Sequence, residues 1–231
     1  MNGIRRLLEG ALRAAVNPVA SAFTRRRIHP NLLSATGFLI TCSSGYFFHQ
    51  HHVRTAGALI LLGGIFDLFD GTVARRTGLA SSFGAFYDST LDRLSEIVVY
   101  LGLLSLYNDY RLELGDVGMI YAVLLAMAGS LMISYTRARA EGLGIRCTVG
   151  LMQRAERVIL IGFAALLFGE STLFGERGLA LKAAIILLAA LTFLTVVQRM
   201  WWVYRHTRPS GEPSSGAEMR PERTQTREVE A

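Results

Sequence analysis

The chain has 231 residues, of which 51% are hydrophobic, and its mean hydropathy is +0.34. These values favour a polytopic membrane protein over a soluble domain. The net charge is +6, and all but one of the 24 basic residues are arginine. Because the arginines cluster at the ends of apolar segments, the charge indicates membrane topology and anionic lipid or substrate, and argues against a nucleic-acid-binding protein.

The apolar pattern predicts an all-α integral membrane protein in three parts. Residues 1–30 predict a juxtamembrane segment with an amphipathic surface helix over 3–24, since apolar residues recur there at helical spacing and arginines fall on the other side. Residues 31–205 predict a domain of six transmembrane helices, over about 31–50, 56–74, 83–106, 117–136, 157–170 and 178–204. A start as early as Leu151 is the alternative for the fifth of these spans. Residues 206–231, with three prolines and mixed charges, predict a disordered cytoplasmic tail.

Six spans place both termini on one side of the membrane. If that side is the cytoplasm, four basic residues remain outside: Arg54, Arg111, Arg177 and Lys182. Cytoplasmic loops of membrane proteins carry an excess of Lys and Arg. The sequence therefore predicts a multi-pass protein of the cell (inner) membrane with both termini in the cytoplasm.

Four carboxylates lie close together in otherwise apolar segments: Asp67 and Asp70 in one predicted span, and Asp88 and Asp92 in the next. Spacings of three and four residues put each pair on one face of its helix. Unpaired acids are costly in a membrane, and those present usually face a cavity or partner and mark function. Oxygen ligands converging from two helices predict a divalent-cation site.

Three interpretations of these acids differ in what they predict. Structural pairing with nearby arginines is disfavoured, because buried ion pairs rarely repay their desolvation. A cation transporter or channel would need acids along the whole path, but all four lie near the cytoplasmic ends of their spans. A metal site that handles phosphate agrees with both the number and the position of the acids.

The same stretch carries a specific motif. Asp, two residues, Asp-Gly, two residues, Ala-Arg, eight residues, Gly, three residues, Asp, three residues and Asp follow one another in order. The eight fixed positions are Asp67, Asp70, Gly71, Ala74, Arg75, Gly84, Asp88 and Asp92. They resemble the signature of the CDP-alcohol phosphatidyltransferase family at every fixed position, and the six-span layout with an N-terminal surface helix also resembles that family.

The resemblance implies an enzyme in which a hydroxyl of an acceptor alcohol attacks the β-phosphorus of a CDP-linked lipid and releases CMP. It implies a homodimer and Mg²⁺ or Mn²⁺ held by Asp67, Asp70 and Asp88. Asp92 is then the general base, and a second ion, if one binds, has Asp92 as a ligand. The residues implied for the nucleotide are Asp67, Asp70, Gly71, Ala74, Arg75 and Gly84.

The acceptor is indicated by the residues around the motif. The run from Asp88 to Arg93, Asp-Ser-Thr-Leu-Asp-Arg, resembles prokaryotic synthases that use inositol phosphate. A phosphorylated acceptor needs cationic donors, and Arg137, Arg154 and Arg199 lie at the cytoplasmic ends of three predicted spans. We therefore expect CDP-diacylglycerol and inositol 1-phosphate as substrates, with glycerol 3-phosphate or serine as the alternative acceptor.

Overall fold

The computed structural model describes residues 23, 25, 29–109, 116–169, 172–173 and 176–207. The surface helix predicted over residues 3–24 lies outside the described residues, apart from Phe23. Most of the predicted tail, from residue 208 onward, also lies outside them.

Six helices make up most of the described chain. They are α2 (Pro30–His49), α3 (Val53–Thr77), α4 (Ser82–Tyr107), α5 (Val117–Gly142), α6 (Arg154–Phe168) and α7 (Leu179–Thr207). A small antiparallel hairpin, β1 (Thr172–Leu173) with β2 (Glu176–Arg177), precedes α7 where the sequence predicts an outer turn. The predicted segments are thus confirmed as helices, although several boundaries differ. Helix α3 begins before residue 56 and ends after residue 74, α5 continues beyond residue 136, α6 begins at Arg154, and α7 continues beyond residue 204.

The turn between α3 and α4 joins the two helices that carry the acids. Helix α3 ends at Gly78, which has a φ of 68°, a left-handed conformation that glycine adopts without a steric penalty. Helix α4 begins after Ser81, whose hydroxyl accepts a hydrogen bond from the backbone N–H of Gly84 at 3.0 Å. These two caps set the length and direction of the turn.

The lengths of the described helices and their exposed apolar side chains indicate a membrane protein. Helices α3, α5 and α7 are long and apolar enough to cross a membrane. The other three helices also expose large apolar side chains, such as Leu39 of α2 (63% exposed), Leu101 of α4 (53%) and Ile159 of α6 (53%). Repeated exposed apolar side chains indicate a surface that contacts lipid or another protein.

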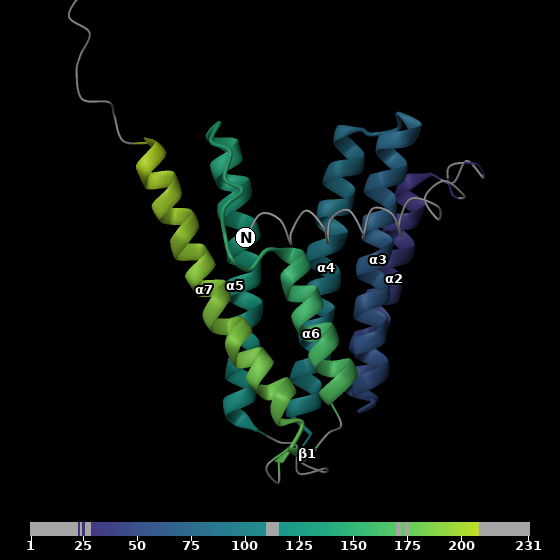
Figure 1. The fold of residues 1–231 in the computed structure, drawn as a ribbon, viewed down its shortest axis with the longest axis vertical. Helices are drawn as coiled ribbons and strands as arrows, with labels where there is room; N and C mark the ends of the chain where they lie inside the picture. The colour runs from purple at the N-terminus through teal and green to yellow at the C-terminus, as the bar shows by residue number, and fades with distance from the viewer. Residues whose placement is uncertain are drawn as a thin grey trace, which may run out of the picture.

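The helices pack in two groups with α6 between them. Helix α2 packs against α3 and α4, α5 packs against α7, α6 contacts both α3 and α7, and α4 also contacts α5 directly. In Figure 1 the pair α5 and α7 diverges from α2, α3 and α4 toward the end at which α7 finishes and the α3–α4 turn lies. The acids of α3 and α4 lie toward this end, so the packing places them beside α6.

Helices α2 and α4 approach closely at two glycines. A Cβ atom at Gly102 would lie 2.6 Å from the Cα and carbonyl oxygen of Gly45. We expect Gly102→Ala to lower the free energy of unfolding by about 1–3 kcal/mol, as overpacking does, because backbone atoms must move. Gly142→Ala is the control, since a Cβ atom there meets nothing within 4 Å. Thermal unfolding in detergent measures both, and equal midpoints would contradict the close approach.

Candidate active site and metal centre

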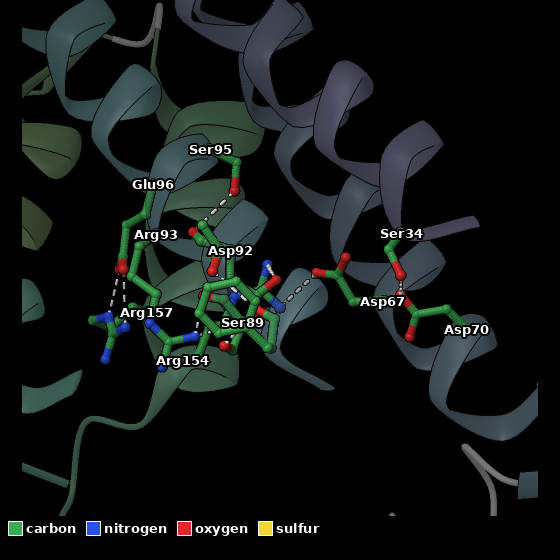
Figure 2. Close-up of polar contacts among 12 residues, drawn as sticks. Ser34, Asp67, Asp70, Ser89, Asp92, Arg93, Ser95, Glu96, Arg154 and Arg157 are labelled. Atoms are coloured by element: carbon green, nitrogen blue, oxygen red, sulfur yellow. Dashed lines mark hydrogen bonds and ion pairs between the residues drawn. The ribbon is translucent and has the colours of Figure 1, made fainter. Parts of the chain in front are cut away.

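Three carboxylates from two helices converge at one point. Each of Asp67 and Asp70 of α3 and Asp88 of α4 offers an oxygen, and these oxygens lie within 4.8 Å of one another. Asp70 is 5% exposed and accepts a hydrogen bond of 2.6 Å from the hydroxyl of Ser34 on α2 (Figure 2). Carboxylate oxygens are the ligands that Mg²⁺ and Mn²⁺ prefer, so this donor set fits such an ion.

Asp92 is joined to this group through an arginine of α6. Arg154 places Nη1 2.6 Å from Oδ2 of Asp67 and Nη2 2.7 Å from Oδ1 of Asp92 (Figure 2). Arg93 adds a longer contact of 3.8 Å to the other oxygen of Asp92. A single guanidinium therefore bridges α3 and α4 beside the candidate metal ligands.

Six of the eight motif residues line one groove, on the side of the acids away from Arg154. The groove has a volume of about 220 Å³ and is bounded by Asp70, Gly71, Ala74, Arg75, Gly84 and Asp88, together with residues of α2 and of the α3–α4 turn. A Cβ atom at Gly71 would meet its nearest neighbour, Arg75 Nη1, at an ordinary 3.6 Å. Packing within the protein therefore does not require glycine at position 71. The absence of a side chain there instead indicates space for a ligand.

The three arginines predicted for the acceptor each have protein partners. Arg137 of α5 pairs with Glu141 at 2.9 Å on the exposed surface. Arg199 of α7 is 3% exposed and donates to the backbone carbonyls of Val149 and Ile133. Arg154 alone of the three contacts the carboxylates of the motif, and convergence of all three on one phosphate stays a prediction.

Three residues near the acids were not identified from the sequence. Glu96 and Arg157 form a two-pronged ion pair between α4 and α6, and Ser34 holds Asp70. Glu96 continues the four-residue spacing of the acids on α4, so a signal for it existed. The contact between Ser34 and Asp70 joins positions far apart in the sequence, and no local pattern indicates it.

A family model described as CDP-alcohol phosphatidyltransferase matches residues 27–201. The chain belongs to this family. An archaetidylinositol phosphate synthase of Methanothermobacter thermautotrophicus is 37% identical over 194 residues, which are 84% of this chain and 91% of the relative. A crystal structure of the phosphatidylinositol phosphate synthase of Mycobacterium tuberculosis with CDP-DAG bound matches with a TM-score of 0.72 and 29% identity, over 84% of this chain and 95% of that one. A structure of the same enzyme with manganese and citrate also matches, with a TM-score of 0.72 and 29% identity over 84% of this chain and 90% of that one.

Membership confirms the resemblance that the eight motif positions carry. This CDP-alcohol phosphatidyltransferase is a transferase that uses a divalent metal, and its fold matches that of a relative that binds manganese. The convergent oxygens of Asp67, Asp70 and Asp88 are the group of described residues that fits such an ion.

Proposed function

We propose that this chain transfers the phosphatidyl group of CDP-diacylglycerol to a hydroxyl of inositol 1-phosphate and releases CMP. The observation that carries the proposal is the group of converging carboxylates of Asp67, Asp70 and Asp88, with a guanidinium that joins Asp67 to Asp92, in a chain of this family. The relatives named above differ in the lipid of their names, archaetidyl or phosphatidyl, but share inositol phosphate.

The four acids have different roles in the proposed reaction. Asp67, Asp70 and Asp88 would hold the divalent ion, a second ion would take Asp92 as a ligand, and Ser34 fixes the orientation of Asp70. An ion held there would neutralise charge that develops on the diphosphate as CMP leaves. Asp92 accepts the proton of the attacking hydroxyl, a role that requires a carboxylate within hydrogen-bond reach of the acceptor.

The groove beside the acids receives the CDP group. Gly71, Ala74 and Gly84 are small residues along it, and Arg75 supplies a cation at its edge. Together with Asp67 and Asp70, they form the nucleotide site. A backbone without bulky side chains lets a nucleotide approach α3 and α4 closely.

The phosphate of the acceptor binds to arginines on the α6 side of the acids. Arg154 is beside Asp92, the proposed base, so a phosphate held there brings a ring hydroxyl within reach of that carboxylate. Arg137 and Arg199 complete the proposed phosphate site, since a guanidinium fork matches phosphate oxygens. Serine has no phosphate and would leave this cluster without a ligand.

The protein is proposed to span the cell (inner) membrane six times, with an amphipathic helix before the first span. Residues 31–205 form the catalytic domain, and the acids and both termini lie on the cytoplasmic side. A 20-residue α2 reaches about 30 Å, enough to cross a bilayer, and its exposed apolar side chains support this arrangement. A homodimer is proposed from the family resemblance.

The direct test is CMP release by the purified protein with CDP-diacylglycerol and Mg²⁺. We expect release with inositol 1-phosphate and none with glycerol 3-phosphate, serine or free inositol. Release with another alcohol instead would keep the reaction class and overturn the acceptor. Ion flux without a CDP-lipid requirement, and no CMP release with any alcohol, would favour a transporter.

A further inference from the structure

A second acid–arginine pair lies next to Asp92 and Arg154. Nε and Nη2 of Arg157 contact the two carboxylate oxygens of Glu96 at 2.6 and 3.0 Å. Nη1 of Arg157 donates to the carbonyl oxygen of Met152 at 3.1 Å, and the arginine is 3% exposed. A buried guanidinium with both prongs on one carboxylate is a strong, directional pair.

The two pairs repeat along the interface between α4 and α6. Glu96 follows Asp92 by four residues on α4, and Arg157 follows Arg154 by three on α6, so each pair repeats about one turn further along (Figure 2). All four side chains line a single cavity together with Asp67. Glu96 also attracts Arg154 electrostatically, so Arg154 has a third carboxylate within range besides Asp67 and Asp92.

The backbone that leads into α6 is held in place from α7. Thr195 and Gln198 accept hydrogen bonds from the backbone N–H groups of Met152 and Leu151, at 3.0 and 3.3 Å. Arg199 donates to the carbonyl of Val149 at 2.9 Å. Irregular backbone inside a membrane protein must find such partners. Because this segment is fixed, the position of the Arg154 guanidinium depends on which carboxylates attract its side chain.

We propose that Arg157 is a positioning residue: by neutralising Glu96, it keeps Arg154 on Asp67 and Asp92. This inference rests on the proposed function for the role of Arg154 at the acceptor. Without Arg157, Glu96 is a partly buried carboxylate, 15% exposed, that has lost the partner of both its oxygens, which is unfavourable. Arg154 then turns toward Glu96, about one helical turn along α4, and leaves both Asp67 and the acceptor phosphate.

A different result is expected if the Glu96–Arg157 pair is only a clamp, that is, a structural link between α4 and α6. If the pair served to hold the helices together, removing both partners would be at least as harmful as removing Arg157 alone. If Arg157 acts by neutralising Glu96, removing the charge of Glu96 as well restores Arg154 to its place. The double variant therefore separates the two roles.

The test compares Arg157→Met, Glu96→Gln/Arg157→Met and Arg157→Lys, with Glu156→Gln on the exposed face of α6 as the control. The first readout is the Mn²⁺ dissociation constant of the purified protein, measured by electron paramagnetic resonance without substrates. Arg154 shares Asp67 with the candidate metal site, so its departure frees an oxygen ligand. We expect Arg157→Met to tighten Mn²⁺ binding on the order of tenfold, within the coupling range of contacting groups. The double and lysine variants should return to the wild-type value.

The second readout is the KM for the acceptor. Arg157→Met should raise it while the KM for CDP-diacylglycerol changes little, and the double variant should restore it. A double variant as impaired as Arg157→Met overturns the proposal. If Arg157→Met does not fold, the double variant still decides, because a clamp predicts that it differs from wild type and neutralisation of Glu96 predicts that it does not. The Mn²⁺ readout needs no acceptor, so failure of inositol phosphate as a substrate would overturn the proposed function without touching this test.

Discussion

Asp92→Asn is expected to lower kcat by about 10²–10⁴-fold, the usual contribution of a general base. Asn has nearly the same shape as Asp but cannot take a proton from the acceptor hydroxyl. Asp92 lies beside Arg154, outside the three acids whose oxygens converge, so Mn²⁺-dependent binding of the nucleotide should change little. CMP release under saturating substrates measures the first effect, and equilibrium binding of a CDP-lipid measures the second.

Asp109→Asn is the matched control for this variant. Asp109 follows α4 at the opposite end from the acids and contacts His51, so the same chemical change is made far from the reaction. We expect its kcat to equal that of wild type. Activity of Asp92→Asn within a factor of two or three of wild type would show that another group accepts the proton. The contact between Asp92 and Arg154 would then be purely structural.

The sequence alone predicts the helices and the pairing of the acids on helix faces, because both depend on the local pattern of residues. Apolar runs about one bilayer long predict helices, and the spacing of Asp67, Asp70, Asp88 and Asp92 puts each pair on one helix face. Which helices then become neighbours is a property of tertiary packing. The placement of α6 between the two groups, and hence the contact of Arg154 with both Asp67 and Asp92, could not be read from spacing.

Charged residues explain where two of the helix boundaries lie. The predicted fifth span begins at about residue 157, where the apolar run starts, or as early as Leu151, and α6 begins between these positions at Arg154. Arg157 looks like a surface residue in the sequence, and the structure buries it because Glu96 from α4 supplies both partners for its fork. Beyond residue 136, α5 continues to Gly142, and Arg137 and Glu141 form an ion pair four residues apart that supports a helix there.

Asp67→Asn is expected to weaken Mn²⁺ binding at least about tenfold. Loss of a group that merely supports a ligand costs about 10–100-fold in metal affinity, so loss of a ligand itself should cost no less. Asp67 contributes to the converging oxygens and also accepts from Arg154, so the variant loses a negative charge shared by two cations. CMP release at low metal concentration should fall with the affinity.

Metal dependence separates this variant from Asp92→Asn. Raising the Mn²⁺ concentration should restore part of the activity of Asp67→Asn, since the remaining carboxylates of Asp70 and Asp88 still converge. It should restore none of the activity of Asp92→Asn, which lacks the proton acceptor rather than the ion. Unchanged Mn²⁺ affinity in folded Asp67→Asn would remove Asp67 from the ligand set, and its contact with Arg154 would then be its principal role. Rescue of both variants by metal would instead mean that Asp92 acts mainly as a ligand, with the base to be sought elsewhere.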